Sequence, residues 1–385
     1  MIQRLWNAGQ IRAAYEASVK STEARPTTDH PFRDPVRTLD TARQWHEHGI
    51  LCWHNARFPE AGAVLGRAHV ARKAALGEDH PETLDTLERL AALSHYLVAD
   101  DAVARFEDVV ARFERVHGED HVRVAIARRN LAACLRDRQR IAEARTILDR
   151  AVDVIERALP PEHPDVVAAL KVDAMIHNAE GTYHAAIGLA ERAVKLGTRI
   201  WDEDHPLVAS PELTIAGAEL RLGEHKRALK RMPAVVKRLQ RGYGEHPLVA
   251  IAMSKQAHIE LELGSNFQHA ETLIRAAMAM YRKTYPPMPV FMGWILFQIL
   301  FESRQIVEAG ELVLELGDRP SQRQRAAMAG KLANYLVKLG DYPRAIPWLE
   351  RTRDLVEDPE VRVKWDEQVD RWTRHVKRFE RDRDT

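Results

Sequence analysis

The sequence predicts an all-α protein: a right-handed superhelical solenoid of about eight helix pairs with a capping helix at each end. The first observation is a recurring motif, because His80, His121, His163, His205 and His246 follow one another at intervals of 41, 42, 42 and 41 residues. A regular period of this length is typical of solenoids. The second observation is that no segment shows the polar–apolar alternation between turn dipeptides that marks a strand.

A column of small residues supports the same period. Ala144, Ala186, Ala228 and Ala270 are each 42 residues apart. Seven residues after each of them comes a second small or medium-sized residue, in the order Ala151, Ala193, Val235 and Ala277. Residues seven apart share one face of a helix, and small side chains on that face let two helices pack closely.

Each unit is predicted to contain two helices joined by a short turn. In the fourth unit the first helix covers 163–181, where Gly181 ends it, and the second helix covers 182–200. Glycine commonly ends a helix because it tolerates the left-handed conformation. The same glycine recurs in other units as Gly223, Gly264 and Gly340. The predicted units are 34–77, 80–118, 121–159, 163–201, 205–242, 246–284, 288–317 and 321–357.

The repeated histidines are interpreted as helix starts. Proline follows most of them, and proline is favoured at the first helical position. Acids that complement the helix dipole precede three of them, as Asp79, Asp120 and Asp204. Equivalent residues of stacked repeats are ~10 Å or more apart, whereas metal ligands lie within about 2.0–2.2 Å of their ion. The repeated histidines are therefore not expected to share a metal or to form a catalytic cluster.

The two ends of the chain depart from the repeat. Residues 1–24 contain Gly9 and Ala14 at the spacing of a second helix, so they are predicted to form a half-repeat or an N-terminal cap. Residues 34–357 form the predicted solenoid. Residues 359–385 are predicted to form a capping helix and tail, since a solenoid end needs a polar outer face.

The composition argues against several classes of protein. The chain has 385 residues, 45% of them hydrophobic, and its 57 basic and 56 acidic residues leave a net charge of +1. A dedicated nucleic-acid binder usually shows a basic excess. No run of about 18 apolar residues exists, and two cysteines fit a reducing compartment. We expect a cytoplasmic protein without a nucleic-acid or membrane partner, and the Arg- and Ala-rich composition suggests a bacterial source.

No enzyme signature is present in the sequence. The phosphate loop, the nucleophile elbow, the H-E-x-x-H pair and paired C-x-x-C motifs are all missing. We therefore expect a non-catalytic protein without a cofactor.

One short stretch, 45-WHEHGILCWH-54, contains four residues whose side chains commonly bind metals, His46, His48, Cys52 and His54. His48 and Cys52 are four residues apart, so on a helix both could reach one ion. Cys52, however, lies where the repeat expects a buried residue, and free cysteine is commonly a small buried apolar group. Cys134 is predicted to be core for the same reason. We expect no metal here, and the roles of His46, His48, Cys52 and His54 stay open.

The seventh unit, 288–317, is degenerate. It replaces the His-Pro start with prolines and a strongly apolar helix. We interpret this apolar run as core, and the alternative is a homodimer contact through 288–301, since an uncovered apolar face seeks a partner.

The units resemble the 42-residue tetratricopeptide repeats of kinesin light chain. The resemblance is clearest in 118–155, where Asn130, Leu131 and Ala132 match the signature of the first helix. The last unit is similar to the ordinary 34-residue tetratricopeptide repeat. The resemblance covers about 34–357, and bacterial repeats of this kind occur alone or behind the nucleotide-binding module of signalling ATPases.

The resemblance implies a protein- or peptide-binding scaffold whose first helices line a concave groove. It also implies that Asn130 lies where family members use asparagine to hold a peptide backbone. Phasing the units on their small residues places ten candidates on that surface: Arg89, Tyr96, Arg129, Asn130, Arg136, Lys171, Asn178, Arg221, Lys255 and His258. This basic, amide-bearing set suits the carboxylates and carbonyls of an extended acidic or C-terminal peptide.

We therefore expect an adaptor or sensor that binds a peptide segment. The alternatives are an intracellular peptide-pheromone receptor and the detached sensor half of a nucleotide-binding signal-transduction ATPase.

Overall fold

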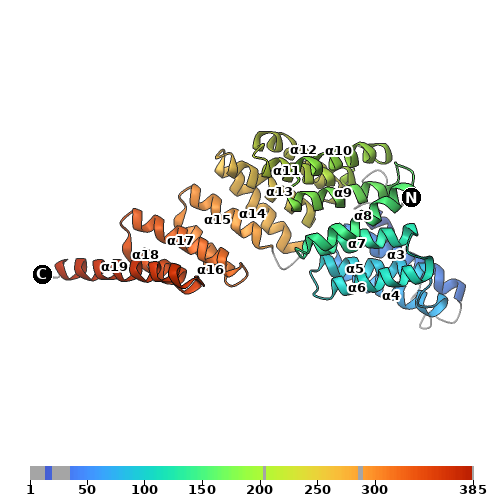
Figure 1. Cartoon of the computed structure of the whole chain (residues 1–385), viewed down its shortest axis with the longest axis horizontal. Helices are drawn as coiled ribbons and strands as arrows, with labels where there is room; N and C mark the ends of the chain where they lie inside the picture. Colours follow the sequence, from blue (N-terminus) through green and yellow to red (C-terminus); the bar gives the residue numbers. More distant parts are fainter. Residues whose placement is uncertain (1–13, 20–34, 203–204, 285–288, 384–385) are drawn as a thin grey trace. The chain divides into compact units, whose positions relative to one another are not determined.

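The structure, a computed structural model, describes residues 14–19, 35–202, 205–284 and 289–383. Every regular element in these ranges is helical, and Figure 1 shows the helices following one another along the chain. Residues 14–19 are helical. The rest of the predicted N-terminal half-repeat, 1–24, lies outside the described residues.

The helices form the predicted pairs. The first helices are α3 (Pro35–His54), α5 (Pro81–Tyr96), α7 (Val122–Asp137), α9 (Pro164–Glu180), α11 (Pro206–Arg221), α13 (Pro247–Glu262), α15 (Val290–Glu302) and α17 (Gln322–Lys338). The second helices are α4 (Phe58–Leu76), α6 (Ala102–His117), α8 (Ile141–Ala158), α10 (Tyr183–Ile200), α12 (His225–Tyr243), α14 (Phe267–Thr284), α16 (Ile306–Leu316) and α18 (Tyr342–Leu355), and α19 (Pro359–Arg383) follows them. The all-α, helix-pair solenoid is therefore confirmed for the described part of the chain.

The repeated histidines are helix N-caps, as predicted. The Nδ1 atoms of His80, His121, His163 and His205 each accept a hydrogen bond from the backbone N–H two residues later, at 3.1–3.2 Å. Nδ1 of His246 accepts from the equivalent N–H at 3.0 Å. Each imidazole thereby satisfies one of the unpaired donors at a helix start.

Two later helices begin differently. Pro289 precedes α15 without a side-chain cap, whereas Ser321 and Gln324 form a reciprocal capping box at α17.

Substituting one capping histidine tests this interpretation. We expect His163→Ala to lower the free energy of unfolding by about 1 kcal/mol, the usual cost of losing an N-cap. Urea unfolding followed by circular dichroism measures the change. His184→Ala is the matched control, because His184 lies exposed on the neighbouring helix α10. Equal stability of the two variants would mean that the cap contributes nothing.

The turn inside each pair contains a residue with a positive φ angle. Gly181 adopts the left-handed conformation with φ 83°, and Gly223, Gly264 and Gly340 have φ of 78°, 62° and 74°. These four glycines therefore end their helices as predicted.

The core lies between successive helices, where the small residues allow close approach. Ala144, Ala186, Ala228 and Ala270 are all fully buried. In the second and third pairs, Phe113 and neighbouring side chains of α5 to α8 form one continuous apolar cluster. Each second helix contacts both its own partner and the next first helix in this region, as in α5–α6–α7–α8–α9.

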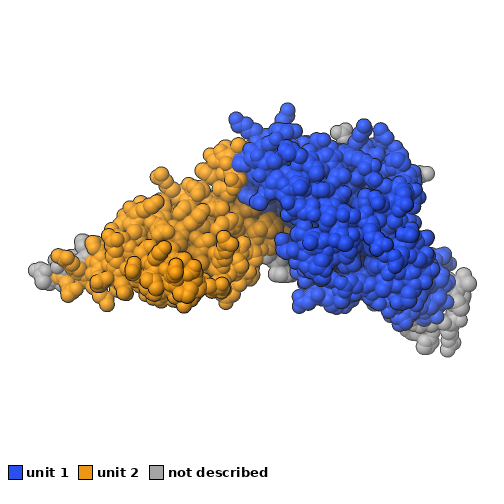
Figure 2. Space-filling model, in the orientation of Figure 1, with its two compact units in different colours: residues 1–259, 283–285 blue, residues 260–282, 286–385 orange. Residues whose placement is uncertain are grey.

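The chain divides into two compact units, coloured separately in Figure 2. The first contains residues 1–259 with 283–285, and the second contains 260–282 with 286–385. In the second unit, α15 buries six large apolar residues in the core: Met292, Ile295, Leu296, Phe297, Ile299 and Leu300. The apolar run of the seventh unit is therefore core, as interpreted, and a homodimer contact through 288–301 stays a prediction.

At its C-terminal end the second unit packs α19 against α18, with Val369 buried beside Leu349 and Ala333. The assignment of 359–385 as a cap, and of 34–357 as one domain, stays a prediction. None of the described helices combines the length and the apolar character that crossing a membrane requires.

Candidate functional site

All ten candidate residues lie on first helices of the first unit. Consecutive first helices contact one another from α3 through α5, α7 and α9 to α11, so they form a continuous layer. The candidates are distributed as Arg89 and Tyr96 on α5, Arg129, Asn130 and Arg136 on α7, Lys171 and Asn178 on α9, Arg221 on α11, and Lys255 and His258 on α13.

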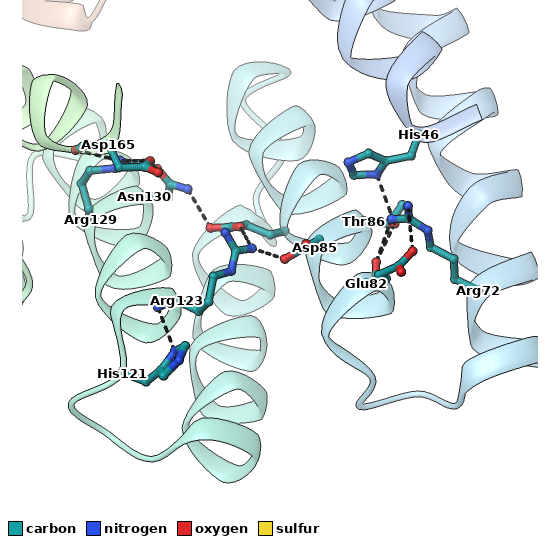
Figure 3. Close-up of polar contacts among 11 residues, drawn as sticks. His46, Arg72, Glu82, Asp85, Thr86, His121, Arg123, Arg129, Asn130 and Asp165 are labelled. Carbon is teal, nitrogen blue, oxygen red and sulfur yellow. Dashed lines mark hydrogen bonds and ion pairs between the residues drawn. The ribbon is translucent and has the colours of Figure 1, made fainter. Parts of the chain in front are cut away.

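A polar network joins α5, α7 and α9 across the middle of this layer (Figure 3). Asn130 Nδ2 donates to Glu88 Oε1 at 2.8 Å, and Arg123 pairs with Asp85. Arg129 Nη1 donates to Asp165 Oδ1 at 2.8 Å, while its Nη2 donates to Asn130 Oδ1 at 3.0 Å. The polar groups of these two candidates are thus engaged within the protein, where they hold neighbouring repeats together.

A second network joins α3, α4 and α5 around Thr86. The Thr86 hydroxyl donates to the Glu82 carbonyl at 3.1 Å and accepts from Arg72 at 2.8 Å. It also lies 3.2 Å from His46 Nδ1, as Figure 3 shows. Burial, with nearby arginines, lowers the pKa of His46 to about 3. The imidazole of His46 is therefore uncharged at neutral pH, and it contributes to the contact between the first and second repeats.

Arg136 is held by an acid at the C-terminal end of α7. Its guanidinium pairs with Asp137, which also lies 3.2 Å from His95 Nε2 on α5. Although burial opposes it, hydrogen bonds to Asp137 and Cys134 raise the pKa of His95 to about 9. These groups form another link between repeats, with Cys134 buried as predicted.

Three candidates on α9 and α13 are differently placed. Lys171 Nζ has one weak partner, Ser210 Oγ at 3.5 Å. Lys255 has no hydrogen bond or ion pair with any residue that the structure describes. Its Nζ lies 2.7 Å from the point where a Cβ on Gly217 would be, and Asn178 Nδ2 lies 3.2 Å from the same point. Because Gly217 has no side chain, the Lys255 ammonium and the Asn178 amide can both lie against α11 at this position.

Both lysines have depressed pKa values. Burial, followed by repulsion from Arg136 and Arg129, lowers the pKa of Lys171 to about 8. Burial alone lowers the pKa of Lys255 to about 8. Both side chains nevertheless keep partial access to solvent. Both ammonium groups are therefore largely, though not completely, shielded from water.

The remaining candidates are Tyr96, Arg89, Arg221 and His258, and His258 lies one turn from Lys255 on α13. The Tyr96 ring packs against Phe58 with 4.8 Å between centroids, so it belongs mainly to the packing of the first two repeats. Arg89 and Arg221 are exposed, and His258 is partly exposed.

The first and fifth repeats meet within the first unit. The rings of His54, at the end of α3, and Tyr243, at the end of α12, stack in parallel with 6.3 Å between centroids. Tyr243 also stacks on His246 at 4.6 Å. Burial, followed by the nearby His246, lowers the pKa of His54 to about 3. This contact joins the first helix of the first repeat to the second helix of the fifth.

Helix α3 also carries a compact cluster of potential metal ligands. His48 Nε2 lies 3.5 Å from Cys52 Sγ and 3.4 Å from Glu60 Oε1 on α4. One ligand atom from each residue lies within 4.8 Å of the other two. His48 and Cys52 are buried, whereas Glu60 is partly exposed. The structure thus adds a third residue to the pair noted in the sequence and leaves His46 and His54 outside it.

Three residues important to these arrangements were not identified from the sequence. Gly217 has no side chain, so a search for polar residues on the first helices does not select it. Tyr243 and Glu60 belong to second helices or their ends, which were not searched. A search at 42-residue spacing would have found the Glu88–Asn130 pair.

Comparisons with known proteins agree with the helix-pair fold. Residues 98–157 and 123–199 match the model of the tetratricopeptide repeat family. A clustered mitochondria protein homologue of Culex quinquefasciatus is 28% identical over 155 residues, which are 40% of this chain and 11% of that protein. The chain therefore spans about a tenth of the relative's length.

One solved structure shows the likeness in fold over nearly the whole chain, and a second is similar over about half of it. A Rap protein complexed with competence and sporulation factor has a TM-score of 0.57 and 12% identity, covering 94% of this chain and 97% of that one. Kinesin light chain-like repeats from Podospora anserina have a TM-score of 0.40 and 22% identity, covering 54% of this chain and 98% of that one. A fold of tetratricopeptide type is typical of interaction scaffolds rather than enzymes.

Proposed function

We propose that this chain of tetratricopeptide-type helix pairs is a non-catalytic adaptor or sensor, located in the cytoplasm, that binds an extended peptide of a partner protein. The peptide lies along the concave face formed by the first helices of the first unit. It presents an acidic side chain or its C-terminal carboxylate to Lys255, Asn178 and Lys171. The alternative of a peptide-pheromone receptor would use the same surface.

The observation that supports this proposal is the unpaired ammonium of Lys255. A largely desolvated cation without a counter-ion is costly, and Gly217 on α11 leaves space where a Cβ would lie 2.7 Å from the ammonium. The Asn178 amide adds a second donor beside it. A carboxylate would satisfy both donors and restore the missing negative charge.

The charges around Lys171 support the same ligand chemistry. Arg136 and Arg129 lower the pKa of Lys171, whereas Asp137 is the only acid that raises it among the groups acting on it. An anion entering this region gains attraction from several cations at once, and low local dielectric strengthens that attraction.

Lys255→Met tests the proposal, and we expect opposite effects on binding and stability. Binding of an acidic peptide should weaken at least about tenfold, which corresponds to about 1.4 kcal/mol for one lost charge-assisted contact. The free energy of unfolding at neutral pH should rise by on the order of 1 kcal/mol, because the variant no longer buries an unpaired charge. Lys237→Met, exposed on α12, is the control.

The pH dependence follows from the sign of the pKa shift. The unfolded chain holds the Lys255 proton up to about pH 10.4, whereas the folded protein releases it near pH 8. Between these values the unfolded state binds more protons, so the stability of the wild type should rise with pH. Peptide affinity should fall across the same window as the ammonium loses its charge.

The measurement uses a displayed library of acidic peptides with free C-termini, followed by fluorescence anisotropy on the selected sequence. Amidating the peptide's C-terminus separates terminal from side-chain carboxylates. Wild-type affinity in Lys255→Met, or failure of the library to yield any binder, would contradict the proposal.

A further inference from the structure

The cluster of His48, Cys52 and Glu60 has the geometry of a metal site. The two residues on α3 are four apart and so face the same way, and Glu60 reaches them from the first turn of α4. The atoms that face one another are an imidazole nitrogen, a thiol sulfur and a carboxylate oxygen. Each of these atoms is a ligand type for zinc.

The two separations from His48 match one tetrahedral ion, and the third, between Cys52 and Glu60, is within 4.8 Å. Zinc binds nitrogen at about 2.0–2.1 Å, oxygen at about 2.0–2.2 Å and sulfur at about 2.3 Å, so tetrahedral angles place nitrogen about 3.4 Å from oxygen and about 3.6 Å from sulfur. The distances in the structure are 3.4 Å from His48 Nε2 to Glu60 Oε1 and 3.5 Å from His48 Nε2 to Cys52 Sγ.

A buried serine fixes the orientation of the imidazole. Ser18 Oγ donates its single proton to the carbonyl of Tyr15 at 2.7 Å and lies 2.9 Å from His48 Nδ1. Because a hydroxyl has one proton, Ser18 must accept from an N–H at Nδ1. The Nε2 atom then carries a lone pair aimed at Cys52 and Glu60. Such a partner on the second nitrogen is usual for histidines that bind metals.

The carboxylate is also oriented by its neighbours. Arg57 pairs with Glu60 Oε2, which leaves Oε1 facing His48. The Tyr15 hydroxyl donates to the same carboxylate at 3.3 Å. An Nε2 lone pair and a carboxylate oxygen, two acceptors, therefore face each other at 3.4 Å. The Cys52 thiol supplies the proton that these two acceptors can share, and a cation would take its place with all three groups as ligands.

We propose that His48, Cys52 and Glu60 bind one zinc-class divalent cation. A thiolate with an imidazole selects a borderline-soft ion over magnesium or calcium. On binding, the cation displaces the proton of the Cys52 thiol, which passes to solvent, and a water molecule completes the four ligands. The ion would tie α3 to α4, and Ser18 would be a positioning residue. This inference is independent of the peptide-binding face.

Cobalt(II) titration of the full chain tests the proposal. The protein is reduced, treated with a chelator and titrated with Co²⁺, whose thiolate charge-transfer band and intense visible bands report sulfur ligation and tetrahedral geometry. We expect one equivalent to bind and Zn²⁺ to displace it. Cys134→Ala, at the other buried cysteine, should behave as the wild type.

Three variants distinguish the ligands. Cys52→Ala should lose the charge-transfer band, and Glu60→Gln should lose the tetrahedral spectrum. Ser18→Ala should bind about 10- to 100-fold more weakly, the usual effect of removing a partner of a metal-bound histidine. Since Glu60 is partly exposed, Glu60→Gln keeps the test valid if Cys52→Ala does not fold, which circular dichroism shows.

Two outcomes would overturn the proposal. The first is a folded wild type that shows no cobalt spectrum and no change in melting temperature with excess Zn²⁺. That result would leave a hydrogen-bonded thiol cluster without an ion. The second is an unchanged spectrum and affinity in Cys52→Ala or Glu60→Gln, which would place any bound ion elsewhere.

Discussion

Replacing Phe113 with alanine is expected to lower the free energy of unfolding by about 3–5 kcal/mol. The ring is fully buried in the cluster that α6 shares with α5, α7 and α8. It also lies under the Arg123 guanidinium, 5.2 Å from the ring centroid. Alanine would leave a cavity at the joint between the second and third repeats, where each repeat is stabilised mainly by its neighbours.

Urea unfolding of the wild type and the variant measures this loss as a shift of the midpoint at unchanged slope. Val116→Ala is the control, because Val116 lies on the same helix with 39% of its surface exposed. We expect the control to change stability by less than about 0.5 kcal/mol. A Phe113→Ala loss as small as that of the control would contradict the packing of α6 against α7.

The second large effect is expected at Gly242, in the last turn of α12. A Cβ at this position would overlap Cγ of Pro206, at the start of α11, and would lie 2.7 Å from its Cδ and 3.3 Å from its Cβ. Overpacking of this kind typically costs about 1–3 kcal/mol. We expect Gly242→Ala to lose that much, although alanine has the higher helix propensity.

Pro206→Ala should rescue the Gly242→Ala variant. The substitution removes the two ring carbons that clash and leaves a contact that small shifts can relieve. A double-mutant cycle in urea should therefore give a coupling energy of about 1–3 kcal/mol. Simple additivity of the two single variants would show that these two side chains do not meet.

The fold could be predicted from the sequence because its signals are local and repeated. A histidine before a proline specifies a helix start within two residues, and glycines such as Gly181 specify its end. The histidine and the glycine recur at the same period. The helix boundaries of a unit with a weaker signal can therefore be placed from its neighbours. The division into two compact units has no such signal, since the boundary at 259–260 falls inside α13, a helix that follows the repeat pattern.

The candidate site could be predicted only in part. Phasing identifies which residues face the layer of first helices, but it does not say which of them are already paired. Asn130 is satisfied by Glu88 from the preceding repeat, and Arg129 by Asp165 from the following one. Lys255 differs from these two residues because it has no partner among the described residues, and its ammonium lies in the space left by Gly217.

Glu60 shows a different limit. It is separated from His48 by a turn, and its approach depends on the angle between α3 and α4 and on the register of their contact. Neither quantity follows from spacing along the chain. A ligand contributed by a second helix is therefore invisible to a search of one helix at a time.

The histidine caps also bear on how such a gene can change. The hydrogen bond of each cap spans two residues, so it forms within one repeat. Three of the caps also stack on an aromatic ring at the end of the preceding repeat, namely His117, Trp201 and Tyr243. Recombination between any two of these equivalent junctions would add or delete a whole unit and leave a correctly started helix at the seam. The helices after Pro289 and Ser321 begin with other devices. Growth and shrinkage of the array by this route is accordingly confined to the part of the chain that carries the histidines.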